Sequence, residues 1–132
     1  MLEAISLPVT SVLTGALIIL LMLLSGLVTA RRAVLGGIQF GDADDVELRH
    51  RIRAHGNFIE IAPMVVVAIG LMEAAGAPSP LLWSLAGAFF TGRLLHAIRM
   101  YVRRLWPGLI AIVSQHVICL IAGFWLLDHF LL

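Results

Sequence analysis

Three polar side chains, Arg53, Asn57 and Glu60, are spaced i, i+4 and i+7 at the edge of an apolar stretch. On a helix this spacing places them within an arc of roughly 60°. If Arg53 marks a membrane interface, Glu60 lies roughly 10 Å deeper, at about 1.5 Å per residue. A carboxylate at that depth costs at least about 2.5–3.5 kcal/mol unless it is paired. This face is therefore expected to bind a ligand or to pair with another charged helix.

Basic residues that could pair with this face lie in a later segment, residues 93–104. Arg93, His96 and Arg104 share an arc of roughly 80° on a helix of opposite direction. If Arg104 marks the interface, His96 lies roughly 12 Å deep and Arg93 roughly 16 Å deep, close to the depth of Glu60. We expect the two helices to face one polar pocket. Arginine binds carboxylates in a bidentate manner and Glu60 would take an ammonium group, so the pocket suits a small zwitterionic or polyanionic ligand.

Simpler interpretations remain open for each residue. Glu60 and Arg93 would also form a purely structural buried ion pair. Asn57 would serve as a hydrogen-bonding contact between helices, and His96 as a neutral packed side chain. The simplest role of the arginines near the loops would be to set the orientation of the chain in the membrane; these are Arg49, Arg51, Arg103 and Arg104.

Composition restricts the elements that hold these residues. The chain has 132 residues, of which 61% are hydrophobic and 13% charged, against about 25% charged in soluble domains. The mean hydropathy is +1.02. These values exclude a soluble globular domain, a disordered chain and a disulfide scaffold. The net charge of +1 gives no sign of a nucleic-acid partner, and no pair of His or Cys residues has a convincing metal spacing.

The charges divide the chain into spans. Residues 4–30, 74–92 and 105–127 carry no charge, and each is long enough to cross a bilayer. Residues 61–72 are too few unless polar groups enter the membrane before them. The sequence predicts a single-domain, all-α membrane protein, a bundle of four transmembrane helices. Their expected bounds are about 4–30, 45–75, 80–104 and 108–130.

Arginine sets the orientation. The basic residues cluster in two connections, between the first and second helices and between the third and fourth, which share one side of a four-helix protein. The positive-inside rule places both connections in the cytoplasm and both termini outside. Asp44 and Glu47 have the spacing of a capping box at the start of the second helix. Pro107 and Gly108 are expected to separate the third and fourth helices.

The run from Arg53 to Pro63, with the pattern Arg-x-x-x-Asn-x-x-Glu-x-x-Pro, resembles the second-helix signature of the MAPEG family, membrane-associated proteins in eicosanoid and glutathione metabolism. Residues 30–33 are similar to the end of the first helix in that family, and residues 92–96 to a third-helix motif. Residues 40–42 resemble the small bacterial members, of the microsomal glutathione transferase type. The likeness extends over roughly residues 8–130.

The resemblance implies a homotrimer that binds glutathione at the protomer interface near the cytoplasmic side. Carried over by position, Arg53 would hold a glutathione carboxylate, Asn57 the peptide backbone and Glu60 the γ-glutamyl ammonium group. Arg31 is a candidate for a second carboxylate. Two further matches, Arg93 and His96, would support or line the pocket.

The implied chemistry is activation of the glutathione thiolate for attack on a lipophilic electrophile that arrives from the lipid. Arg104 is the candidate catalytic residue, with Arg103 behind it. The sequence thus favours a bacterial inner-membrane glutathione transferase or peroxidase. Because Met100 stands where several active relatives have tyrosine, a non-catalytic glutathione- or lipid-binding accessory protein is the alternative. A small multidrug transporter that uses Glu60 for proton coupling is a third interpretation.

Overall fold

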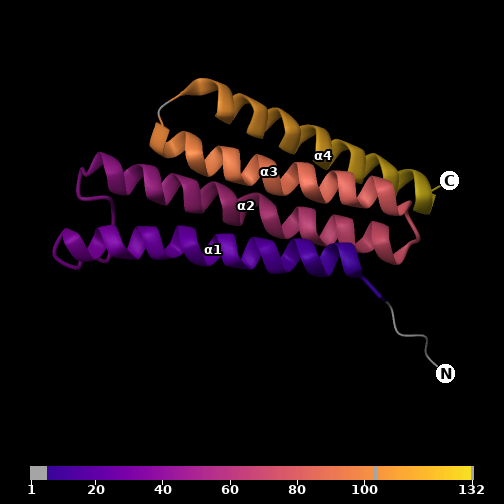
Figure 1. The fold of residues 1–132 in the computed structure, drawn as a ribbon, viewed down its shortest axis with the longest axis horizontal. Coiled ribbons are helices and arrows are strands. Elements are labelled where there is room, and N and C mark those ends of the chain that lie inside the picture. The colour runs from indigo at the N-terminus through magenta and orange to yellow at the C-terminus, as the bar shows by residue number, and fades with distance from the viewer. Residues whose placement is uncertain (1–5, 103, 132) are drawn as a thin grey trace.

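The computed structural model describes residues 6–102 and 104–131, and over this part of the chain it contains four α-helices (Figure 1). They are α1 (Pro8–Val34), α2 (Val46–Ala74), α3 (Ser79–Val102) and α4 (Leu105–Leu131). Each is long and apolar enough to cross a bilayer. The prediction of an all-α, multi-pass membrane protein with four spans is confirmed.

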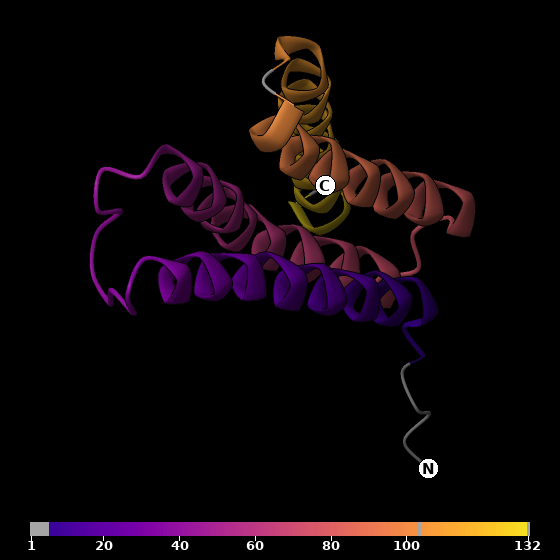
Figure 2. The ribbon, with the colours of Figure 1, turned by 60° about the vertical axis from the view of Figure 1, so that its left-hand side comes forward.

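The helices form two hairpins, α1–α2 and α3–α4, that pack against each other (Figure 1). α2 and α3 are central, because each contacts the three other helices. α1 and α4 lie outside, with no contact between their described residues. Figure 2 shows that the hairpins diverge at the end that carries the α1–α2 and α3–α4 connections. The polar residues singled out by the sequence lie toward this end.

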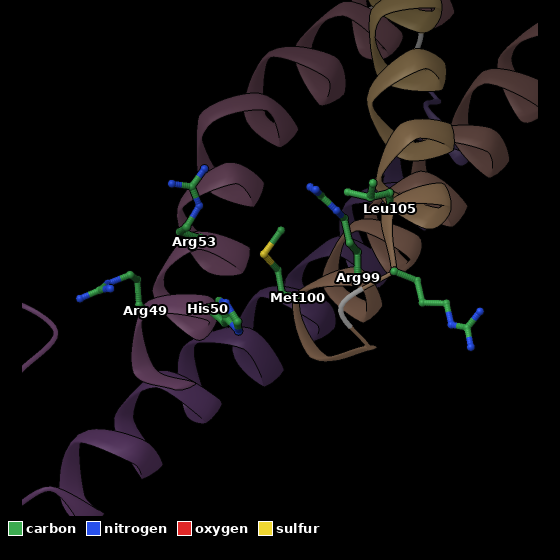
Figure 3. Close-up of a pocket in the computed structure, with 7 residues that line it drawn as sticks. Arg49, His50, Arg53, Arg99, Met100 and Leu105 are labelled. Atoms are coloured by element: carbon green, nitrogen blue, oxygen red, sulfur yellow. The ribbon is translucent and has the colours of Figure 1, made fainter. Parts of the chain in front are cut away.

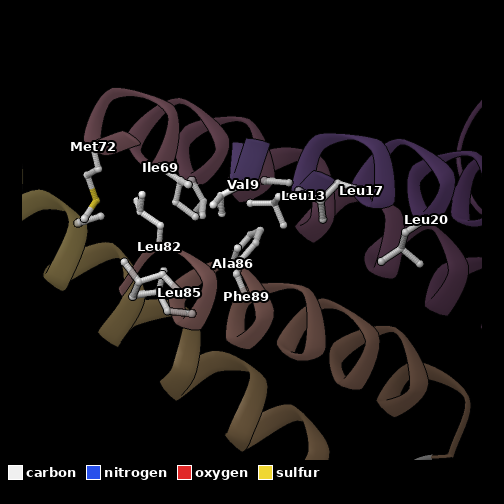
Figure 4. Packing of buried hydrophobic residues seen from close by; sticks show 14 of the residues in the cluster. Val9, Leu13, Leu17, Leu20, Ile69, Met72, Leu82, Leu85, Ala86 and Phe89 are labelled. Atoms are coloured by element: carbon white, nitrogen blue, oxygen red, sulfur yellow. The ribbon is translucent and has the colours of Figure 1, made fainter. Parts of the chain in front are cut away.

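Apolar residues at helical spacing join the hairpins into one core. The buried positions of α1 recur every three or four residues, as expected for a helix with one packed face. Phe89 of α3 lies among them, and Figure 4 shows its neighbours from α1, α2 and α3. The core includes Val9, Leu13, Leu17, Leu20, Ile69, Met72, Leu82, Leu85 and Ala86. The outer faces of α1 and α4 expose large apolar side chains, as lipid contact requires.

Several helix ends differ from the expected bounds, and α1 begins at Pro8 instead of about residue 4. α1 continues to Val34, so that Arg31 and Arg32 lie in its last turn, where cations interact favourably with the helix dipole. α4 begins at Leu105, which places Pro107 inside its first turn instead of in the connection. Proline is tolerated there because the first N–H groups of a helix have no partner within it.

The start of α2 is fixed by Asp45, one residue after the expected cap at Asp44. The Asp45 carboxylate accepts a hydrogen bond from the Leu48 N–H at 2.6 Å and is the N-cap of the helix. It also binds Arg31 in a bidentate manner, at 3.0 and 2.7 Å. The Arg31 guanidinium, together with the Leu48 N–H, lowers the pKa of Asp45 from 3.8 to about 2.

At the opposite end of the bundle, the N-terminus of α1 is capped by a side chain of α2. α1 has no side-chain cap of its own at Leu7. Glu73, near the end of α2, accepts hydrogen bonds from the Val9 N–H and the Thr10 N–H, both at 2.8 Å, and from Thr10 Oγ1 at 2.7 Å. A carboxylate at a helix N-terminus satisfies free N–H groups and complements the dipole. Glu73 therefore joins the start of α1 to the end of α2.

Candidate functional site

A cationic pocket of about 320 Å³ opens between α2, α3 and the α3–α4 connection (Figure 3). We call it the basic pocket. It is lined by Arg49, His50, Arg53, Arg99, Met100, Arg104 and Leu105. Its volume is at the lower end of the range of small-molecule sites, about 300–1,000 Å³. Two of the predicted site residues, Arg53 and Arg104, are thus brought together.

The basic pocket has an excess of positive charge. No aspartate or glutamate is among its lining residues. Arg49 is neutralised, because it forms ion pairs with Asp42 and, at 3.5 Å, with Asp44. Arg53, Arg99 and Arg104 form no ion pair with any described residue. An anionic ligand is therefore the natural complement of this pocket.

A second hollow, of about 490 Å³, adjoins the basic pocket on the side of the α1–α2 connection. It shares Arg49 and Arg53 with the basic pocket and adds Arg32 and Asp42. The Arg49 guanidinium, with the Asp44 N–H, holds the pKa of the Asp42 carboxyl below its usual value. Arg49 is in this way held toward the connection, whereas Arg53 lies between the two hollows.

Arg93 lies outside the lining of the basic pocket and is only 2% exposed. Its Nη1 donates to Asn57 Oδ1 at 2.7 Å, and its Nη2 donates to Gln115 Oε1. The guanidinium carbon lies 5.2 Å from the centroid of the Phe89 ring, a cation–π distance. Arg93 Nε has no hydrogen-bond partner among the described residues. The group links α2, α3 and α4 through one buried cation.

This arrangement differs from the expected proximity of Glu60 and Arg93. Glu60 is exposed on α2 and is not among the acceptors of the Arg93 guanidinium. The buried face of α2 carries Ala54 and Phe58, which directs Glu60 toward the outside of the single chain. His96 is buried one turn after Arg93 on α3.

Arg31 takes part in a different set of contacts. Besides Asp45, it binds Glu47 at 3.0 Å. Arg51 also contacts Glu47 and donates to the Leu27 carbonyl at 2.6 Å. These pairs join the end of α1 to the start of α2. Arg103, the second candidate catalytic residue, lies outside the described residues.

Sequence reasoning missed two participants, Gln115 and Arg99. Gln115 is a polar residue inside the uncharged stretch 105–127, and that position was the available signal. Arg99 was interpreted as a topology determinant, because its position near a loop does not distinguish a loop cation from a pocket cation.

One comparison with known proteins, against family models, agrees with this architecture. No curated protein and no solved structure matches the chain. The family model described as MAPEG family matches residues 9–127 of the 132, which covers all of α2 and α3 and all but the start of α1 and the end of α4. The chain therefore belongs to the MAPEG family, a family of four-helix membrane proteins.

Proposed function

We propose that this protein is a membrane-bound glutathione transferase or peroxidase, which activates the glutathione thiolate for attack on lipophilic electrophiles. The observation that carries the proposal is the basic pocket of a MAPEG chain, in which Arg53, Arg99 and Arg104 have no carboxylate partner among the described residues. Glutathione with an ionised thiol has three negative groups and one positive group, which fits a site with surplus cations.

The assigned residues fit glutathione to different degrees. Arg53 lines the pocket and is available for a carboxylate. Asn57 Oδ1 already accepts from Arg93, so its Nδ2 group remains to donate to a carbonyl or carboxylate of the ligand. Glu60 is exposed and available for the γ-glutamyl ammonium group. Arg31 would have to exchange a contact with Asp45 or Glu47 to take the second carboxylate.

Thiolate activation sets an energetic requirement. A free thiol has a pKa of about 8.5, and lowering it to about 6 requires about 3.4 kcal/mol, at 1.36 kcal/mol per unit. A cation 4 Å away supplies about 1 kcal/mol in bulk water but about 4 kcal/mol at an effective dielectric constant near 20. An arginine that is partly withdrawn from water is therefore sufficient, and a fully solvated one is not.

The proposed reaction needs no nucleophile from the protein. The thiol proton passes to water, and the thiolate sulfur forms a bond to the electrophilic carbon. The leaving group departs with the electrons of its own bond. In the peroxidase reaction two glutathione molecules become the disulfide, while a hydroperoxide is reduced to an alcohol and water. The residues of the pocket bind the carboxylates and stabilise the ionised sulfur.

We further propose a homotrimer in a bacterial inner membrane. Glu60 is exposed on a membrane-spanning helix, and a lipid-exposed carboxylate at that depth is costly. A second copy of the chain that covers this face, with glutathione between the copies, removes the cost. The positive-inside rule places the Arg-rich end of the bundle in the cytoplasm and both termini in the periplasm.

One observation favours a second candidate, a glutathione- or lipid-binding accessory protein without turnover. Met100 lines the basic pocket, and its thioether cannot donate a hydrogen bond to a thiolate. In this case glutathione would bind, but its thiol would not be activated.

Calorimetry and a conjugation assay test the proposal together. Purified protein should bind glutathione saturably and conjugate a generic aryl halide well above the uncatalysed rate, and Arg53→Leu should abolish both. Arg51→Leu is the matched control, because Arg51 is also on α2 but contacts Glu47 and Leu27 instead of the pocket. Binding without conjugation would favour the accessory protein, and the absence of glutathione binding would contradict the transferase and any accessory role that depends on glutathione.

A further inference from the structure

Gly108, in the first turn of α4, has no side chain, and the side chain of Arg99 occupies the space that a Cβ atom would fill. A Cβ atom at Gly108 would overlap Arg99 Cδ and would lie 2.5 Å from Nε and 3.0 Å from Cζ. The end of the arginine side chain therefore lies directly on the α4 backbone, and a side chain at position 108 would displace it. Gly108 is buried, so the arginine covers it. The Arg99 side chain thus packs along the start of α4.

The same arginine faces the basic pocket. Arg99 and Leu105, the first residue of α4, both line it, and Figure 3 shows their side chains next to each other. Arg99 forms no ion pair in the described part of the chain. Its charge is thus available to a ligand, while its stem packs against the α4 backbone.

Arg99 is better prepared to act on a ligand than its neighbour Arg104. Arg99 is half-buried on a helix, whereas Arg104 is exposed in the connection between α3 and α4. A charge that is partly withdrawn from water acts more strongly on a nearby anion than a solvated charge does. A side chain that already packs against a helix also loses less conformational freedom when the ligand binds.

We propose that Arg99, which packs against Gly108, is a further cation of the glutathione site and stabilises the thiolate together with Arg104. This inference rests on the proposed function. In the step concerned, the glutathione thiol loses its proton to water, and the negative charge on sulfur is stabilised by the Arg99 guanidinium. Gly108 is a positioning residue, because it acts only through the placement of Arg99.

A pH titration of the ultraviolet thiolate band of bound glutathione tests the proposal. Arg99→Gln should raise the midpoint by about one unit, within the range for loss of a neighbouring opposite charge, and reduce the thiolate fraction about tenfold below the midpoint. Gly108→Ala should raise the midpoint in the same direction, although it keeps every charge. Combining the two substitutions should add little to Arg99→Gln alone.

Gly123→Ala is the matched control. It introduces the same methyl group into α4, at a position with nothing within 4 Å of the new atom, and should leave the midpoint unchanged. Arg99→Lys keeps the charge and tests whether the planar guanidinium is needed. It also provides a second variant for the titration if Gly108→Ala does not fold. It should shift the midpoint less than Arg99→Gln does.

The outcomes separate this inference from the proposed function. A normal wild-type band whose midpoint is the same in Arg99→Gln and Gly108→Ala would overturn the role of Arg99 alone. Wild-type protein that binds no glutathione, or binds it without a thiolate band, would overturn the proposed function and this inference with it.

Discussion

The buried Arg93 cation gives a sharp prediction for stability. Gln115→Leu removes the α4 acceptor of Arg93 Nη2 while nearly preserving side-chain volume. In the variant the guanidinium keeps its contact with Asn57, but Nη2 loses its partner. Arg93 Nε already lacks one in the described structure. At 2% exposure Arg93 has little access to water that would replace the lost contact.

The magnitude follows from the charge on the donor. A hydrogen bond to a charged group contributes about 1.5–3 kcal/mol. Gln115→Leu should therefore lower the free energy of unfolding by about 1.5–3 kcal/mol. Arg93→Met in the same chain removes the unpaired donor, so the double variant should lose less than the sum of the two single variants. A coupling of about 1–2 kcal/mol is expected, within the range for residues in one network.

Equilibrium unfolding in mixed detergent micelles, followed by far-ultraviolet circular dichroism, measures these differences. Ile112→Leu is the control, because Ile112 is exposed on the same helix and should have almost no effect. Gln115→Glu retains an oxygen acceptor and should be less destabilising than Gln115→Leu. The reasoning would be refuted by a Gln115→Leu variant within about 0.5 kcal/mol of wild type, or by strict additivity in the double variant.

Three further predictions concern the contacts between helices. Because Arg31 lowers the pKa of Asp45 from 3.8 to about 2, the stability from this pair is present above pH 4 and lost as the pH falls toward 2. Unfolding measured between pH 5 and 2 should show a smaller loss for Asp45→Asn than for wild type. Glu73→Gln should cost about 0.5–2 kcal/mol in the detergent assay, because a neutral amide supplies only one acceptor oxygen to the start of α1, and equal stability would contradict the capping role. A Cβ at Gly92 would lie 2.9 Å from Ser114 Oγ, so Gly92→Ala should lower the melting temperature and Ser114→Ala should restore it, whereas a lack of rescue would assign the loss elsewhere.

The helices could be predicted from the sequence because charge and membrane length determine them together. Three uncharged stretches are long enough to cross a bilayer, so the positions of three helices were closely restricted. The fourth uncharged stretch is too short by itself, and α2 reaches the required length because its polar first turns extend it. The end of α3 was harder, because proline is compatible both with a connection and with a first turn. The structure has Pro107 in the first turn of α4.

The site was harder to predict, because depth in a membrane does not fix the rotation of a helix. Glu60 and Arg93 have similar predicted depths, yet the structure buries Arg93 against Asn57 and Gln115 and leaves Glu60 exposed. Asn57 and Glu60 lie within the same arc of roughly 60° on α2. The spacing of the two residues does not reveal which of them faces α3. Finding Gln115 required the packing of α4.

The position of Arg99 on Gly108 was equally inaccessible from the sequence. The contact joins two helices across a short connection, and its only trace in the sequence is a glycine beside a proline, a pair that also marks an ordinary turn.

The most direct test of the central claim is a glutathione titration of the purified protein in detergent at neutral pH, followed by the ultraviolet thiolate band. The account predicts a saturable band that Arg53→Leu removes, because this arginine of the basic pocket is proposed to hold a glutathione carboxylate. The absence of a band despite glutathione binding, or a band of equal size in Arg53→Leu, would contradict the claim that this pocket binds and activates glutathione.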